Sequence, residues 1–312
     1  MKRLFTSRNA GLDGLAPARN RDGMALVLTL MIVAIITAMV VEFAYGVYTN
    51  TTSLSNWQTS QQLSLAARSA MKLAARVIAE KALDTNTPGA FAISQKVPFG
   101  DLDTTLSLSI EDENAKFNLN TLIYQNGGLN NDRYAQFVRL LQYLKLPTAI
   151  ADRVADWIDP DSEPRLADSE KGAKNAYLDS VDELLLIPGI DRKTYERLLP
   201  YVTIYGSAVS AGLININDAS LPVLMSLPGV DEQMARRVIE YRNIKPFAQK
   251  GEIGNVAGFE SLVMGPFVGY ITTDRTVFSV TATAESGGIR RTIDSVLQVS
   301  GLSAVVIYWK ET

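Results

Sequence analysis

The stretch RNRDGMALVLTLMIVAIITAMVVEF, residues 19–43, decides how the rest of the chain must be arranged. It places two arginines and an aspartate directly before residues 24–41, a run that carries no charge. Because an α-helix rises about 1.5 Å per residue, this run spans roughly 27 Å, close to the thickness of the hydrocarbon core of a bilayer. The sequence therefore predicts one membrane-crossing helix near the N-terminus.

The residues before this run carry a net charge of +3, from five basic and two acidic side chains. The positive-inside rule keeps such a segment in the cytoplasm and sends the rest of the chain across the membrane. The run ends in bulky residues, Val40 to Phe43, where a secretory signal peptide would have small residues at a cleavage site. We therefore expect the apolar helix to be retained. A plain signal anchor satisfies the same rules.

The composition of the chain argues against catalysis. The 312 residues are 47% hydrophobic and 20% charged, which is enough to bury one or two ordinary cores, and they include no cysteine and no histidine. Disulfides and thiolate metal sites are thereby excluded, as are Ser-His-Asp and Cys-His catalytic groups and the common zinc sites. We expect a protein that is not an enzyme and has no catalytic cofactor. A pair of carboxylates is the strongest catalytic alternative.

A long helix is expected to continue beyond the membrane. No proline occurs between Pro17 and Pro88, so residues from Met24 to about Leu83 can form one helix. In the second half of this helix, apolar residues recur every three or four positions, a pattern typical of a face that packs against a sheet. This stripe consists of Leu63, Ala66, Ala67, Ala70, Leu73, Ala74, Val77 and Ile78.

Strand patterns occur on both sides of a helical region, which predicts an α+β fold. Residues 102–110 alternate between apolar and polar side chains, and residues 276–284 and 292–300 flank a Gly-Gly turn that is typical of a hairpin. Residues 304–309 supply a further strand. Residues 132–245 show helical periods instead. We expect a small antiparallel sheet packed on the long helix, with a large all-α domain inserted into it.

The inserted region contains a duplication. Residues 180–202 and 220–242 align without gaps, with Pro-Gly at the same place and Asp191 matching Asp231. Both segments predict helix-hairpin-helix units, which in some proteins bind DNA phosphates at a helix N-terminus. Here the two aspartates would cap those helices and repel phosphate. After residue 23 the net charge is about −6, so we expect no nucleic-acid partner.

An acidic loop is the candidate metal site. Residues 156–177, DWIDPDSEPRLADSEKGAKNAY, supply many carboxylates, and Ca²⁺ takes six to eight oxygen ligands. The lysines at positions 171 and 174 would oppose a cation, and a solvated acidic loop is the simpler interpretation. The same acids are also the candidates for a catalytic carboxylate pair. The candidate calcium ligands are Asp156, Asp159, Asp161, Glu163, Asp168 and Glu170.

The charge-to-apolar boundary resembles a known leader. A basic residue, an aspartate and Gly23, followed by Met24, are similar to the site where prepilin peptidase cuts type IV pilin-like proteins. Most such proteins carry glutamate at the fifth mature position, where this chain has Leu28. That difference, the inserted hairpins and the segment EDENAKFNLN, residues 111–120, resemble the type II secretion minor pseudopilin K. The resemblance extends from the leader to Trp309.

The resemblance implies cleavage between Gly23 and Met24, methylation of the new N-terminus and calcium in the acidic loop. It implies a non-enzymatic subunit at the tip of the pseudopilus, anchored in the inner membrane with most of the chain periplasmic. This subunit would help to initiate the filament and support export across the outer membrane. The implied partners are I- and J-type minor pseudopilins, the major pseudopilin, prepilin peptidase and inner-membrane lipid. The alternative function is a membrane-anchored helix-hairpin-helix DNA receptor.

Contacts with the other pseudopilins are expected along the apolar stripe of the long helix, between about Phe43 and Ile78.

The expected segmentation of the chain follows from the patterns described above. The expected segments are a cytoplasmic leader (1–23), the transmembrane (24–43) and periplasmic (44–85) parts of the long helix, a pilin-like α/β domain (86–120 and 259–312) and the inserted helical domain (121–258).

Overall fold

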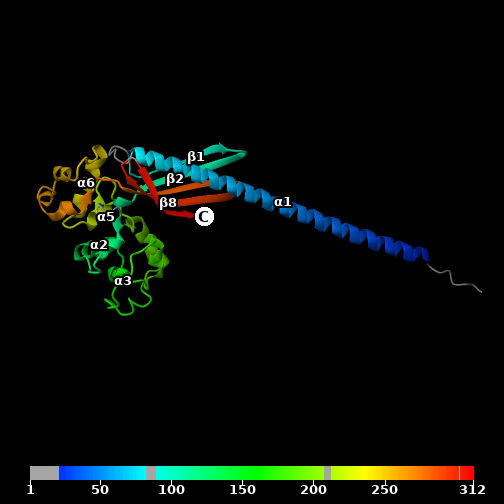
Figure 1. The fold of residues 1–312 in the computed structure, drawn as a ribbon, viewed down its shortest axis with the longest axis horizontal. Coiled ribbons are helices and arrows are strands. Elements are labelled where there is room, and N and C mark those ends of the chain that lie inside the picture. The colour runs from blue at the N-terminus through cyan, green and yellow to red at the C-terminus, as the bar shows by residue number, and fades with distance from the viewer. Residues whose placement is uncertain (1–20, 82–88, 207–211, 302) are drawn as a thin grey trace, which may run out of the picture. The chain divides into compact units, whose positions relative to one another are not determined.

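The computed structural model describes residues 21–81, 89–206, 212–301 and 303–312. The chain divides into two compact units, residues 1–58 and 59–312. The first element, α1 (Arg21–Lys81), is one unbroken helix that belongs to both units (Figure 1). The single long helix predicted from the missing prolines is therefore present, within three residues of its expected bounds.

In the described part of the first unit, α1 exposes its apolar side chains, including Met24 and Phe43. Hydroxyl groups on this segment are bonded within the helix, since Thr37 Oγ1 donates to the carbonyl of Val33 at 2.7 Å. A helix with satisfied polar groups and an apolar surface suits the interior of a bilayer. Among the described residues it is the one helix long and apolar enough to cross a membrane.

The second unit contains a five-stranded antiparallel sheet in the order β1-β2-β7-β8-β9 (Figure 1). The expected hairpin between β7 and β8 turns on Gly287 and Gly288, whose φ angles of 57° and 80° suit a tight two-residue turn. The strands are β1 (Phe91–Phe99), β2 (Leu102–Asp112), β7 (Val277–Ser286), β8 (Ile289–Ser300) and β9 (Ser303–Glu311).

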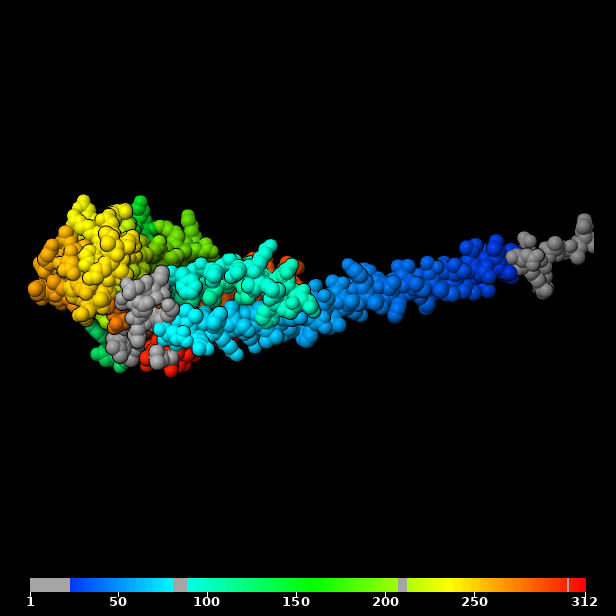
Figure 2. Space-filling model, turned by 90° about the horizontal axis from the view of Figure 1, so that it is seen from above, coloured from blue at the N-terminus to red at the C-terminus, as the bar shows by residue number. Residues whose placement is uncertain are grey.

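The second half of α1 packs on this sheet. Leu63 and Ala67 of the helix are fully buried, together with Val280 and Ala282 of β7. Small residues on both surfaces let the helix lie close to the strands. Figure 2 shows this part of α1, in cyan, side by side with the β1–β2 hairpin. Leu73 belongs to the expected stripe but does not pack on the sheet, since it is 63% exposed.

Two hydrophobic clusters fill the region between β2 and β7. The first extends from Phe117 to Ile204, and the second from Ile214 to Ile271. The elements of the first are η1 (Glu113–Ala115), β3 (Phe117–Asn118), η2 (Leu119–Leu122), α2 (Asn131–Tyr143), α3 (Ala149–Ile158), η3 (Val181–Leu186), α4 (Arg192–Leu198), η4 (Leu199–Tyr201) and β4 (Val202–Thr203). Those of the second are β5 (Ile214–Asn215), α5 (Leu221–Ser226), α6 (Glu232–Ile244), η5 (Lys250–Asn255), η6 (Leu262–Met264), η7 (Pro266–Gly269) and β6 (Ile271–Thr272).

Both clusters are closed in the same way. In each, the first strand pairs in parallel with the last, β3 with β4 and β5 with β6. Each also has an asparagine that bonds both backbone groups of one distant residue. Asn120 joins Leu178 at 2.9 and 3.0 Å, and Asn217 joins Phe247 at 2.8 and 2.9 Å. The insertion therefore consists of two modules, each with adjacent ends.

The insertion is wider than residues 121–258. Phe117 at its start, and Phe259 and Phe267 near its end, are buried in the two helical clusters. The described strands of the sheet end at Asp112 and resume at Val277. Large aromatic side chains favour whichever core offers the most burial, and here that core is helical.

The segment 180–187, expected to be helical, forms the 3₁₀-helix η3. Its first turn has a capping box, in which Ser180 and Glu183 bond each other's backbone amides. The capping box stabilises the first turn, and the Pro-Gly pair that follows ends the helix after a short 3₁₀ segment.

Candidate functional site

The two hairpin helices begin at aspartates. Asp191 Oδ1 accepts a hydrogen bond from the amide of Thr194, and Asp231 Oδ1 accepts one from the amide of Met234, each at 2.8 Å. Hydrogen bonds from Thr194 hold the pKa of Asp191 below its ordinary value. The amides that would meet a phosphate are therefore occupied by carboxylates of the chain itself. This confirms the capping role predicted from the sequence.

Three acids of the candidate metal loop come together. Asp156 and Asp159 lie at the end of α3, three residues apart and so on one face, and both are fully buried. The loop that follows folds back and brings Glu170 to them. Carboxylate oxygens of the three residues, hereafter the acidic cluster, all lie within 4.8 Å of one another.

The other three candidate ligands do not join the acidic cluster. Asp161, Glu163 and Asp168 are exposed. Asp161 Oδ1 accepts the amide of Glu163 at 2.8 Å, which shapes the turn after α3. Of the six acids taken from the sequence, the structure brings three to one place.

Arg165 lies in the acidic cluster and was not foreseen. Its Nη1 donates to both Asp156 and Asp159, and its backbone amide donates to Asp156 at 2.9 Å. Ser169 Oγ also donates to Asp156. Burial lowers the pKa of the guanidinium, but the hydrogen bonds to Asp159 and Asp156 and the charges of these acids together outweigh it, so the pKa of Arg165 is raised. The sequence offered one signal, since Arg165 is the only basic residue between Asp156 and Glu170.

Part of the acidic cluster remains without a partner. The Oδ1 atom of Asp159 and the Oε1 atom of Glu170 are buried and accept no hydrogen bond from any residue that the structure describes. Burial raises the pKa of both carboxyl groups, with a further contribution at Glu170 from the neighbouring acids. Carboxylate oxygens are the ligands that Ca²⁺ prefers, so the residues fit this ion. Lys174, which was expected to repel a cation here, instead has its ammonium paired with Asp179 and Glu183.

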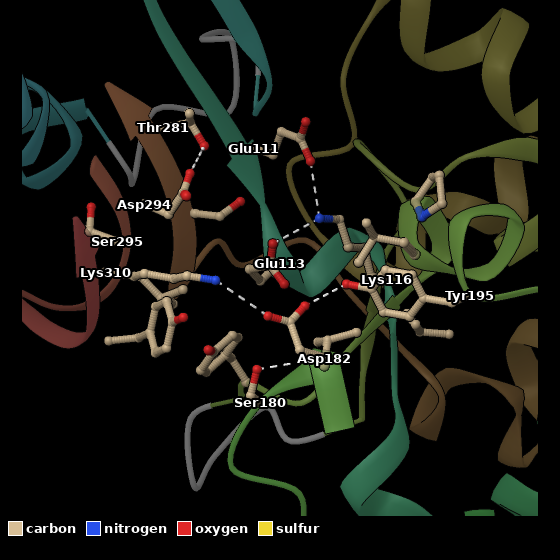
Figure 3. A pocket seen from close by; sticks show the side chains of 18 residues that line it. Glu111, Glu113, Lys116, Ser180, Asp182, Tyr195, Thr281, Asp294, Ser295 and Lys310 are labelled. Carbon is tan, nitrogen blue, oxygen red and sulfur yellow. Dashed lines mark hydrogen bonds and ion pairs between the residues drawn. The ribbon is translucent and has the colours of Figure 1, made fainter. Parts of the chain in front are cut away.

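A cavity of about 640 Å³ lies between the first module and the sheet. Figure 3 shows its polar and charged groups directed at one another: the phenol of Tyr195 and the ammonium of Lys310 both reach Asp182, at 2.6 and 3.5 Å. Lys116 lies 3.0 Å from Glu111 and also pairs with an acid of η1. Burial raises the pKa of Tyr195, so its phenol stays protonated and donates. These pairs join the first module to the sheet. The carboxylates that line the cavity are therefore engaged in ion pairs and hydrogen bonds and do not form a free catalytic pair.

Comparisons with known families divide the insertion where the modules do. The model of the family described as type II secretion system (T2SS), protein K, matches residues 115–207. The helix-hairpin-helix motif model matches residues 209–272.

Several curated relatives span most of the chain. The type II secretion system protein K of Pseudomonas aeruginosa is 28% identical, over 75% of this chain and 76% of its own. That of Aeromonas hydrophila is 24% identical, over 89% and 93%. That of Klebsiella pneumoniae is 31% identical, over 58% and 61%.

A solved structure has the same fold. It comes from the crystal structure of the GspK-GspI-GspJ complex of the type 2 secretion system of enterotoxigenic Escherichia coli. The TM-score is 0.65 at 18% sequence identity, and the match covers 84% of this chain and 99% of the other.

Proposed function

The chain belongs to the protein K family of the type II secretion system, and from this premise we propose that it caps the pseudopilus as a minor pseudopilin. At the tip it binds I- and J-type minor pseudopilins, meets the major pseudopilin below them, helps to initiate the filament and supports export across the outer membrane. The observation that carries this proposal is the match of nearly the whole fold to a chain solved in such a complex.

Leu28 supports the tip position. A glutamate inside a membrane helix is costly unless it is paired, and in pilin-like proteins its partner is the positive N-terminus of a neighbour. Leu28 cannot form that pair, so this subunit gains nothing from docking below another. The ammonium of Met24 after cleavage still serves the next subunit's glutamate. The insertion between Asp112 and Val277 is also too bulky to repeat on every subunit along a thin filament, whereas it meets no obstruction at the end of the filament.

The partner surface on α1 cannot include most of the predicted stripe, because most of its residues are buried. Leu63, Ala67 and Ile78 are buried against the chain's own sheet, so they are not free for a partner. The large side chains of α1 that stay exposed in this part of the helix are Phe43, Tyr45, Val47, Tyr48, Leu54, Trp57, Leu65 and Leu73.

Binding to the I- and J-type partners tests the function. We expect the full-length chain in detergent to co-purify with them, and Trp57→Ala to weaken the complex at least tenfold, because exposed aromatic residues commonly dominate interfaces. Ser53→Ala, an exposed polar change one turn away, is the control. Crosslinks mapped along assembled filaments should place the chain at one end. Recovery at regular intervals down the shaft would refute the tip position.

We further propose that the chain lies in the inner membrane with its second unit in the periplasm, and that prepilin peptidase removes residues 1–23. The net charge of +3 before the apolar run supports this orientation. Residues 1–20 of the leader lie outside the described residues. Gly23 is at the start of α1, with no neighbouring atom within 4 Å of a Cβ added there.

Leader cleavage predicts a mature protein that starts at a methylated Met24. Mass spectrometry of the chain from membranes with active prepilin peptidase measures this directly. Gly23→Ala should slow processing because it adds a side chain at the scissile bond. Gly46→Ala, a second glycine of α1 with an equally open environment, should leave processing unchanged. Intact Met1 in those membranes would rule out the leader.

Calcium is the proposed ligand of the acidic cluster, as a structural ion without a catalytic role. Because binding to the folded state stabilises it, millimolar Ca²⁺ should raise the melting temperature above that in chelator. Asp159→Ala should reduce the gain, while Asp161→Ala, an exposed acid outside the acidic cluster, should not. Identical melting of the native chain with and without calcium would contradict binding.

Neither DNA binding nor catalysis is part of this proposal. The DNA-receptor alternative is disfavoured by the aspartate caps and by the net charge of about −6 after residue 23. With histidine and cysteine missing from the sequence, no side chain can act as the usual base for a nucleophile.

A further inference from the structure

The acidic cluster already holds one cation, the side chain of Arg165. We propose that this guanidinium is the resident occupant of the site and that a divalent cation must displace it in order to bind. The inference rests on the calcium binding proposed above. It adds a competitor built into the loop, so that the loop has an arginine-held state and a calcium-held state.

The charge balance of the acidic cluster favours replacement of the guanidinium by a divalent cation. The acidic cluster brings three carboxylates against one guanidinium, and Asp156 and Asp159 are fully buried. Two carboxylate oxygens, one on Asp159 and one on Glu170, accept no hydrogen bond within the described part of the chain. Buried negative charge without a partner is costly, and an arginine offers only donors in a fixed plane. A divalent ion supplies twice the charge and can be reached by oxygens from several directions.

The two occupants exclude each other. The Nη1 atom of Arg165 bonds to Asp156 and Asp159 at once, so it fills the space between two of the candidate calcium ligands. Calcium binds such oxygens at about 2.3–2.6 Å, and two positive charges at that place would repel. The guanidinium must therefore leave before the ion can take up these ligands.

The loop is built so that the side chain of Arg165 can leave while the backbone stays. The amide of Arg165 remains on Asp156 Oδ2 at 2.9 Å, and Ser169 donates to the same carboxylate. The Arg165 side chain is 26% exposed, whereas those of Asp156 and Asp159 are fully buried, so it has a path to solvent. Without calcium, Arg165 keeps the loop folded, and with calcium it becomes a surface residue.

The test removes the competitor. Calcium binding to the chelator-treated full-length chain in detergent is measured by calorimetry, together with melting with and without the ion. Arg165→Gln is expected to bind Ca²⁺ at least tenfold more tightly than the native chain. It should melt at a lower temperature in chelator and recover when calcium is added. Arg165→Lys, which keeps the charge, should have an intermediate affinity. Arg192→Gln, an exposed arginine paired within α4, is the control.

The outcomes separate this inference from the proposals before it. Equal or weaker calcium affinity in Arg165→Gln overturns it, as does binding in neither protein. Binding in Arg165→Gln but not in the native chain supports it and removes only the proposal that the native chain binds calcium. If Arg165→Gln unfolds in chelator, folding on addition of calcium supports the exchange and failure to fold refutes it. None of these results depends on assembly with other pseudopilins.

Discussion

Replacing Arg275 by methionine is expected to lower the free energy of unfolding of the second unit by about 3–5 kcal/mol, because it strands a buried carboxylate. Arg275 Nε donates to Asp218 at 2.6 Å and Nη2 donates to it at 3.2 Å, with both side chains nearly buried. Asn215 bridges Asp218 to Asp112, and the amide of Gly89 also donates to Asp218. These residues, hereafter the root network, lie where the chain passes between the sheet and the insertion.

Denaturant unfolding of the full-length chain in detergent measures this loss. Adding Asp218→Asn to the variant should recover part of it, since the stranded charge is removed. Arg290→Met is the matched control, because Arg290 pairs with Glu285 at 2.7 Å on the surface and should cost less than about 1 kcal/mol. Equal losses for Arg275→Met and Arg290→Met would show that the root network carries no special stability.

The root network also gives a dependence on pH. Burial, followed by the charge of Asp218, raises the pKa of Asp112 well above its ordinary 3.8. Between pH 3.8 and this raised pKa, the native state holds a proton on Asp112 that the unfolded chain releases. The contribution of Asp112 to the free energy of unfolding is therefore full below pH 3.8 and is lost as pH rises through its raised pKa. Because Arg275 lowers the pKa of Asp112, Arg275→Met should extend this loss to higher pH.

Truncating Phe137 to alanine should cost about 3–5 kcal/mol by leaving a cavity in the first module. Phe137 is fully buried and stacks on Phe117, with ring centroids 5.2 Å apart. Hydrogen exchange should become faster around Leu140 and Leu184 in the same cluster. Amides of the second cluster, such as that of Phe247, should keep their protection.

Tyr124→Ala is the control for this truncation, because Tyr124 is an aromatic residue that is 52% exposed. It should change unfolding by less than about 0.5 kcal/mol. Uniform loss of protection in both modules after Phe137→Ala would mean that they form one cooperative core rather than two.

Local patterns in the sequence predicted most of the elements. Unbroken helical residues gave α1, and the helical periods gave α2, α3 and α6 within a few residues of their observed ends. Alternation and the Gly-Gly turn gave β7 and β8. Strand β1 was missed because it lies at an edge, where most of its side chains are exposed and little alternation is imposed. It also contains Pro98, which an edge strand tolerates.

Long-range placement could not be predicted in the same way. Whether an acid in the loop points inward or to solvent depends on how the loop folds back, which the spacing of Asp156, Asp161 and Asp168 does not encode. Arg165 illustrates this, because a single arginine among acids is equally consistent with a surface ion pair. The partners of Arg275 are similarly distant, since Asp218 lies 57 residues away in the chain.

The adjacent ends of the two modules bear on how the sheet folds. Asp112, the last residue of β2, pairs with Phe278 of β7, although the whole insertion separates them in sequence. Closing so long a flexible loop would be slow, because its entropy is lost before the strands gain any contact. Once each module has folded on its own, its ends meet at β3–β4 and β5–β6. The loop that remains is then short. The modules are thus expected to form early and the central pair of strands late, so that changes in the modules slow folding of the sheet more than they speed its unfolding.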